Sequence, residues 1–269
     1  MVSTTSIICM IFTALFTIFM PIVVAIVFYK KTKFKWRFFF AGAVVFTVMQ
    51  IFIRVPILQS VLPQMQWYKN MTENVWIYAI FLGLTAGIFE EVGRYIAFKT
   101  VLRKHLNWKN GVAFGIGHGG IESILIVGLS YISNLIMAFM INNGLFDTLI
   151  GPTMSQELIT QLKSGLIDTP SYMFLVASLE RALTFVIHIG FSVLVMLGIR
   201  RGKGLLYLLL AILLHMVLDA AVVIMSSYGV NAFIIEGFVG ICTIASIVFL
   251  VKTGNDAKDK EGEIGFINE

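Results

Sequence analysis

The sequence is poor in charged residues and in cysteine, and it has no internal repeat. Only 13% of its 269 residues are charged, whereas a soluble domain has about 25%. Cys9 and Cys242 both lie in apolar runs, so the sequence predicts neither a disulfide framework nor a thiolate metal site. No register of 20–50 residues repeats, which excludes a solenoid or repeat array.

Long apolar runs make up most of the chain. Hydrophobic residues account for 58% of the sequence, and the mean hydropathy is +0.89. About 20 apolar residues cross the hydrocarbon core of a bilayer. We therefore predict an all-α fold, a polytopic transmembrane helical bundle. Seven runs fit as spans, at approximately 6–29, 38–62, 75–98, 111–141, 172–198, 205–225 and 232–252.

The fourth run is too long for one straight crossing. We expect it to tilt, to kink or to leave the bilayer near Asn134, so an eight-span count stays open. The first run is too long for the core of a signal peptide, and no basic residue precedes it. It is therefore interpreted as a retained first helix.

Basic residues alternate between the connections. They cluster after spans one, three, five and seven, whereas the alternate connections 63–74 and 142–171 carry only Lys69 and Lys163. Positive residues favour the cytoplasmic side, so we predict an N-terminus outside. The net charge of +5 reports this orientation and gives no sign of nucleic-acid binding. The predicted location is the cell membrane, with multiple passes and the lipid bilayer as partner.

The domain organisation follows from these spans. We predict a single transmembrane domain over residues 1–252 and a short cytoplasmic polar tail over residues 253–269. The tail mixes charges of both signs and contains glycine, which favours a solvated end without regular structure. For the longest connection, 142–171, two structures are expected as alternatives, a short outer helix or a lid.

Ionisable residues inside the spans are the main functional signal. Each ionised side chain in a bilayer costs roughly 2.5–3.5 kcal/mol or more, and such residues are usually functional. The third span contains Glu90, Glu91 and Arg94. The further ionisable residues within apolar runs are His118, Glu122, Glu180, Arg181, His188, His215 and Asp219.

Glu90 and Glu91 lie four and three residues before Arg94, so all three share one side of a helix. One alternative is a buried ion pair that fixes helix packing. That alternative satisfies one carboxylate and leaves the second without a partner in this helix. We therefore expect one glutamate to be held by Arg94 and the other to face a cavity, where it can act as a general base or acid.

Two further pairs have the same four-residue spacing. His118 and Glu122 lie among glycines, which also favour close helix packing. His215 precedes Asp219, whose carboxylate could fix the tautomer of the imidazole. Glu180 and Arg181 are adjacent, and they form either a structural pair in the outer leaflet or part of the site.

Depth in the membrane connects these groups. Glu90, His118, His188 and His215 each lie seven to ten residues from the end of a span that faces a basic loop. At a rise of 1.5 Å per residue, they lie roughly 10–15 Å inside the predicted cytoplasmic boundary. Four helices therefore deliver these side chains to one level, which scattered structural pairs would have no reason to do.

Several chemistries remain open for such a site. His118, His188 and His215 could hold a divalent metal such as Zn²⁺ that activates water. Alternatively, a glutamate and a histidine could activate water without a cofactor. Both routes lead to hydrolysis inside the membrane. The competing classes are a small proton- or ion-coupled transporter and a non-catalytic receptor or scaffold.

The residues also resemble a known group of membrane proteases. Glu90-Glu91-Val-Gly-Arg94 resembles the EExxR first motif of the CAAX prenyl protease and bacteriocin-processing (CPBP) families and their PrsW relatives. Phe114-Gly-Ile-Gly-His118 is similar to their FxxxH motif, and His215-Met-Val-Leu-Asp219 to their HxxxN/D motif. His118-Gly-Gly-Ile-Glu122, with Glu180, Arg181 and His188, most resembles the YhfC branch. The resemblance covers spans three to six.

The resemblance implies an intramembrane endopeptidase of a bacterial plasma membrane, either a glutamic-type or a metallo-type peptidase, which cleaves a membrane-associated peptide or protein near the cytoplasmic leaflet. It implies that Glu90 and His118 activate water and that Glu91 and Arg94 orient the site. His215, with residue 219, would stabilise the oxyanion or complete the water site. Prenyl proteases usually have Asn where this chain has Asp219. Because an ionised aspartate is a poor oxyanion donor, Asp219 has two other roles open to it, to orient His215 or to bind a metal.

Overall fold

The computed structural model describes the backbone of residues 1–267 and the side chains of residues 1–257. Every regular element within residues 1–267 is helical. Seven helical segments are long and apolar enough to cross a bilayer. The predicted all-α transmembrane bundle is therefore confirmed, with seven candidate spans, and the chain is a multi-pass membrane protein.

Five spans are single helices. They are α1 (Thr4–Thr32), α4 (Val75–Lys99), α9 (Met173–Arg200), α10 (Gly204–Ser227) and α11 (Ala232–Ile267). The second span consists of α2 (Trp36–Phe46), η1 (Thr47–Arg54), η2 (Ile57–Val61) and η3 (Leu62–Gln64). The fourth consists of α5 (Trp108–Glu122), η4 (Ser123–Gly128) and α6 (Leu129–Asn142). The connecting helices are α3 (Gln66–Thr72), α7 (Phe146–Leu149), η5 (Gly151–Thr153) and α8 (Gln156–Ile167).

The two composite spans contain π-helical turns, which replace the regular hydrogen bonds of an α-helix locally and often occur at functional sites. In the second span, η1 carries Gln50 and Arg54. In the fourth span, η4 begins immediately after Glu122. The fourth candidate span is one helical segment, Trp108–Asn142, so the helix continues past Asn134, and the point where it leaves the bilayer stays a prediction. The π-helical segments η1 and η4 both adjoin the site described below.

Polar caps start several of the helices. The side chain of Asn74 accepts a hydrogen bond from the backbone of Ile77 at the start of α4. Asn107 does the same for Asn110 at the start of α5. Such caps satisfy backbone N–H groups that have no partner within the helix, and they fix where the spans that carry Glu90 and His118 begin.

Glycine lets the spans that carry the site approach closely. A Cβ atom at Gly117 of α5 would collide with the backbone oxygen of Phe39 in α2. A Cβ atom at Gly87 of α4 would lie 2.8 Å from the backbone oxygen of Ile212 in α10. Close backbone contact through small residues is a usual mode of helix packing in membranes. The glycines therefore hold α5 against α2 and α4 against α10.

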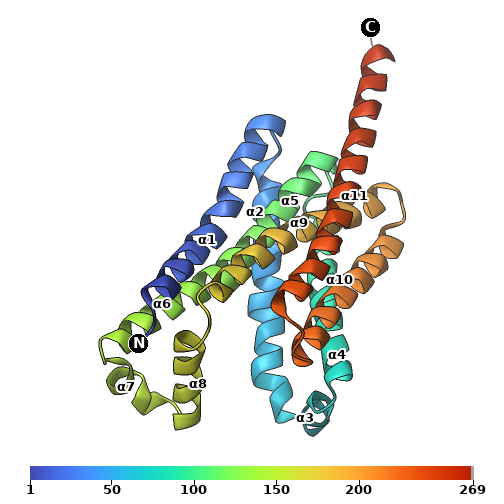
Figure 1. Ribbon diagram of the computed structural model, residues 1–269. Coiled ribbons are helices and arrows are strands. Elements are labelled where there is room, and N and C mark those ends of the chain that lie inside the picture. The colour runs from blue at the N-terminus through green and yellow to red at the C-terminus, as the bar shows by residue number, and fades with distance from the viewer. Residues whose placement is uncertain (268–269) are drawn as a thin grey trace.

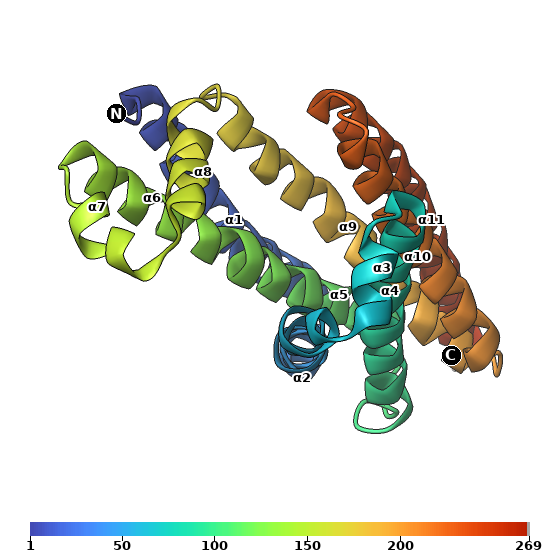
Figure 2. The same cartoon turned by 90° about the horizontal axis from the view of Figure 1, so that it is seen from below.

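The helices are arranged around α9 (Figures 1 and 2). In both views, α9 lies between α5 and α11, while α1 and α10 lie farther apart on opposite sides (Figures 1 and 2). The helices α3, α7 and α8 lie at the lower end of Figure 1, and α11 ends at the upper end. The basic connections that follow α1, α4 and α9 lie at that upper end. The predicted outward orientation of the N-terminus stays a prediction.

The connection 142–171 and the C-terminal tail both contain helix. The connection 142–171 contains the short helix α8, which corresponds to the first of its two alternatives. The helix α11 continues from the seventh span to Ile267. The expected lack of regular structure in the tail 253–269 is therefore wrong for the backbone as far as Ile267, because the helix that leaves the membrane simply continues. Residues 268–269 lie outside the described part of the chain.

Apolar side chains fill the end of the bundle that carries the basic loops. Phe98, Phe114, Val193 and Met196 are fully buried in its largest cluster. Within its span, each of these residues lies nearer to the basic connection than do the ionisable residues selected from the sequence in that span, by four or more positions. The polar groups are thus covered from that end.

Candidate functional site

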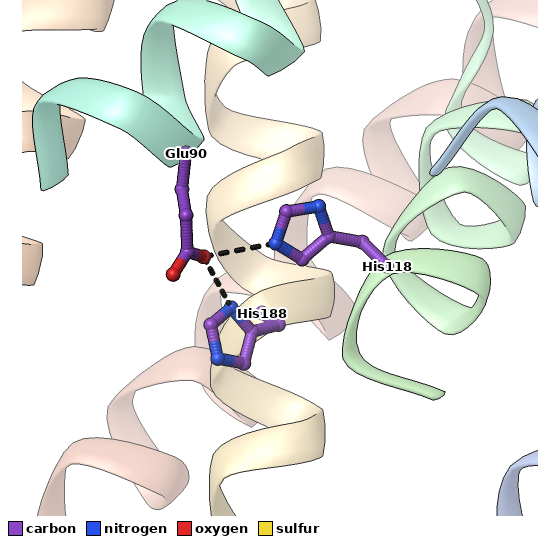
Figure 3. Close-up of side chains that lie close together, drawn as sticks. All are labelled: Glu90, His118 and His188. Carbon is purple, nitrogen blue, oxygen red and sulfur yellow. Dashed lines mark hydrogen bonds and ion pairs between the residues drawn. The ribbon is translucent and has the colours of Figure 1, made fainter. Parts of the chain in front are cut away.

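The carboxylate of Glu90 is the point where five helical segments meet. Its Oε2 lies 2.9 Å from Nε2 of His118 and 3.5 Å from Nδ1 of His188 (Figure 3). Its Oε1 accepts a hydrogen bond from Gln50 and lies 3.8 Å from Nε2 of His215. Glu90 of α4 thus contacts side chains from η1, α5, α9 and α10. Because its exposed fraction is only 3%, these neighbours replace solvent around it.

Arg94 lies fully buried behind this carboxylate. Its guanidinium donates to Glu91 and lies 3.3 Å from Oε2 of Glu90, so it contacts both glutamates. The sequence predicted that it would hold only one. Arg94 also lies 2.8 Å from Nδ1 of His188. Because a guanidinium only donates hydrogen bonds, this nitrogen accepts and Nε2 of His188 carries the proton.

His215 is held by a carboxylate from another helix. Its Nδ1 lies 2.9 Å from Oε1 of Glu91, whereas Nε2 lies 3.6 Å from Oδ2 of Asp219. Glu91, and not Asp219, therefore makes the hydrogen bond to the imidazole and holds a proton on Nδ1. This corrects the prediction from the four-residue spacing. A carboxylate on one imidazole nitrogen orients the ring and leaves the other nitrogen free for chemistry.

The pairing predicted between His118 and Glu122 is also replaced by contacts between helices. His118 pairs with Glu90, and Oε2 of Glu122 lies 2.7 Å from Nε2 of His188. Arg181 donates to Oε1 of Glu122 at 2.8 Å and also pairs with its neighbour Glu180. The structure thus joins all ten residues selected from the sequence into one continuous network.

A cavity of about 350 Å³ adjoins this network. Glu90, His188, His215 and Asp219 form part of its wall, together with apolar side chains of α4, α10 and α11. Glu91, Arg94 and His118 do not line the cavity. The site therefore has an inner layer of buried supporting groups and an outer layer that a ligand in the cavity can reach.

The sequence analysis missed four polar residues at this cavity, Gln50, Arg54, Thr184 and Glu236. Gln50 is buried and links Glu90 to Arg54, whose Nη1 donates to Oε1 of Gln50 at 3.1 Å. The signal was present in the sequence, because Gln50 and Arg54 lie four residues apart in an otherwise apolar span. Glu236 is likewise an isolated acid in the last span.

A divalent metal fits these residues in type. Glu90, His118 and His188 are buried, and each offers one ligand atom within 4.8 Å of the others. One carboxylate with two imidazoles is a zinc ligand set. His215, which the sequence placed among the ligands, lies outside this group. Nδ1 of His188 is occupied by Arg94, so coordination through that atom requires the guanidinium to shift.

The fold and the site define a polytopic membrane protein whose spans enclose a buried glutamate–histidine centre beside a cavity. The chain belongs to the YhfC family, because the model described as YhfC intramembrane metalloprotease matches residues 16–239. It is also 33% identical over 234 residues to "Uncharacterized membrane protein YhfC" of Bacillus subtilis (strain 168), covering 87% of this chain and 90% of that protein. No solved structure matches the chain. The resemblance to the PrsW and CPBP families stays a prediction.

Proposed function

We propose that this protein is an intramembrane endopeptidase that hydrolyses a peptide bond of a membrane-associated polypeptide. The description of the matching family names an intramembrane metalloprotease. One structural observation supports it most: the buried carboxylate of Glu90 contacts side chains of four other helical segments and lines a cavity. Ionisable groups gathered beside a cavity are characteristic of catalytic sites. The bacterial relative supports a bacterial plasma membrane as the location.

Glu90 is the proposed general base. A base has to reach the attacking water by a hydrogen bond and return the proton later. Glu90 reaches the cavity, while His118 at 2.9 Å holds its Oε2 from behind. In the proposed reaction, Glu90 takes a proton from water as the water oxygen bonds to the carbonyl carbon. The proton then passes to the amide nitrogen, and the carbon–nitrogen bond breaks.

His215 is the proposed oxyanion donor. Glu91 fixes Nδ1, and Nε2 points to the region between Glu90 and Asp219. With both nitrogens protonated, His215 donates one hydrogen bond to Glu91 and offers the other to the carbonyl oxygen as it becomes negative. Asp219 lies beside this nitrogen, where its carboxylate helps to orient the ring.

A metal would be held by Glu90, His118 and His188 and would supply Lewis-acid activation of the water and the carbonyl. Glu91 would orient His215 in the same way with or without the ion, whereas Arg94 would have to move away from Nδ1 of His188 if that atom bound the ion. Metal analysis of the purified protein together with a chelator assay distinguishes the two routes.

The experiment that tests the proposed function compares two histidines. The full chain is reconstituted into liposomes with a library of single-span peptides, and products are identified by mass spectrometry. We expect His118→Ala to abolish cleavage and His105→Ala, at an exposed loop position, to preserve it. Equal cleavage by both variants, each folded as judged by thermal unfolding, would contradict the assignment.

A further inference from the structure

The cavity continues beyond the glutamate–histidine centre into a region that the proposed reaction leaves without a role. We call it the acidic end, and it consists of Glu122, Glu180, Arg181 and Glu236, all of which line the cavity. Arg181 donates to Oε1 of Glu122 at 2.8 Å and pairs with Glu180. The guanidinium of Arg181 therefore pairs with two of the three carboxylates, and it does not pair with the third.

Glu236 is the carboxylate of the acidic end that Arg181 does not bind. Its exposed fraction is 7%, and its Oε2 has no hydrogen-bond partner among the residues whose side chains are described. It contributes to the cavity wall from α11. A buried polar atom without a partner costs free energy, and each such atom in a native structure needs an explanation. A hydrogen-bond donor on a ligand in the cavity would provide the partner.

The charge of the acidic end determines the kind of donor. Three carboxylates face one guanidinium, so a cation is favoured over a neutral or anionic group. A metal is a poor occupant, because among the described residues only Glu90, His118 and His188 bring three ligand atoms within 4.8 Å of one another. A cavity of about 350 Å³ has room for a side chain. An ammonium or guanidinium group satisfies these conditions.

We propose that the acidic end is a specificity subsite that binds an ammonium or guanidinium group of the polypeptide substrate, with Glu236 as the main acceptor. This inference rests on the proposed function. Arg181 and His188 are seven residues apart in α9, which corresponds to about 10 Å along the helix. An extended peptide covers that distance in about three residues. If this separation is taken as the distance between the acidic end and the glutamate–histidine centre, the basic residue is expected about three residues from the bond that is cleaved.

The test measures binding and cleavage in the same samples. The full chain in detergent or liposomes is titrated with fluorescent single-span peptides that carry lysine or norleucine at one of four central positions. Norleucine keeps the aliphatic stem and removes the ammonium. Wild type, Glu236→Gln and the control Glu157→Gln, exposed on α8, are compared, and mass spectrometry detects any cleavage.

We expect wild type and Glu157→Gln to bind the best lysine peptide roughly tenfold or more tightly than its norleucine counterpart, and Glu236→Gln to lose most of this preference. A preference that is absent in wild type, or equal in wild type and Glu236→Gln, would overturn the subsite. If Glu236→Gln does not fold, Glu180→Gln takes its place with the same expectation of a reduced preference.

The two proposals fail differently in this experiment. A lysine preference that depends on Glu236, without cleavage of any peptide, supports the subsite and counts against the endopeptidase. Cleavage with an unchanged preference in Glu236→Gln rejects the subsite and leaves the endopeptidase intact.

Discussion

Nδ1 of His215 in α10 lies 2.9 Å from Oε1 of Glu91 in α4, and the same oxygen accepts a hydrogen bond from Arg94. Glu91 is fully buried and does not line the cavity, so it does not touch a substrate. Its proposed role is to orient His215 toward the cavity, as carboxylates behind functional histidines often do.

The variant Glu91→Gln tests this positioning role. The amide keeps the shape of the side chain but removes the negative charge that balances His215 and Arg94. We expect kcat to fall about 10–100-fold with little change in KM, because the cavity wall is intact. Steady-state kinetics measure both parameters, and thermal unfolding confirms that the variant folds. A rise in KM with kcat unchanged would mean that Glu91 acts on substrate binding instead.

Gln50 gives a second prediction. Its amide donates to Glu90, and its carbonyl oxygen accepts from Arg54 at 3.1 Å. The variant Gln50→Leu has a similar volume but holds neither group, so we expect cleavage to fall about tenfold. Gln64→Leu, at the exposed end of the same span, is the matched control and should cleave at the wild-type rate. If both variants cleave at the wild-type rate, Glu90 needs no support from η1, and the prediction is wrong.

Helix packing through glycine gives a third prediction. The variant Gly117→Ala would push α5 away from Phe39 in α2, and overpacking of this kind costs typically about 1–3 kcal/mol. Gly237→Ala in α11 places its methyl group where nothing lies within 4 Å. We expect a lower midpoint of thermal unfolding for Gly117→Ala than for Gly237→Ala. The reverse order would contradict the packing of α2 against α5.

Metal content gives a fourth prediction. Because Glu90, His118 and His188 form a zinc-type ligand set, we expect close to one divalent metal ion per chain in protein purified without chelator. His188→Ala should lower this content and His105→Ala should not, as measured by elemental mass spectrometry. Protein that contains no metal but cleaves at full rate in the presence of chelator would favour direct activation of water by Glu90 and His118.

The sequence predicts the fold well because the bilayer imposes a simple rule. Each crossing needs about 20 apolar residues, so seven runs predict seven spans and the structure has seven candidates. The rule does not distinguish α-helical from π-helical turns, so the irregular geometry of η1 and η4 was not predictable. The rule also places the end of a helix at the first polar residues after an apolar run, whereas α11 continues through polar residues to Ile267.

The sequence identifies the residues of the network better than it identifies their partners. Four-residue spacing predicts neighbours within one helix, and it paired His118 with Glu122 and His215 with Asp219. The shorter contacts cross between helices, from His118 to Glu90 and from His215 to Glu91. Spacing carries no information on which helices adjoin. Gln50 and Arg54 were missed although they show the same four-residue spacing, and Glu236 was missed because a single acid in a long apolar span gives a weak signal.

The most direct measurement is single-turnover cleavage by Glu90→Gln in proteoliposomes, with Glu157→Gln on the exposed face of α8 as its matched control. The amide retains the size of the carboxylate but cannot take a proton from water. If Glu90 is the general base, Glu90→Gln folds, binds peptide and fails to cleave it, while Glu157→Gln cleaves at the wild-type rate. Cleavage by Glu90→Gln at the wild-type rate would contradict the central claim.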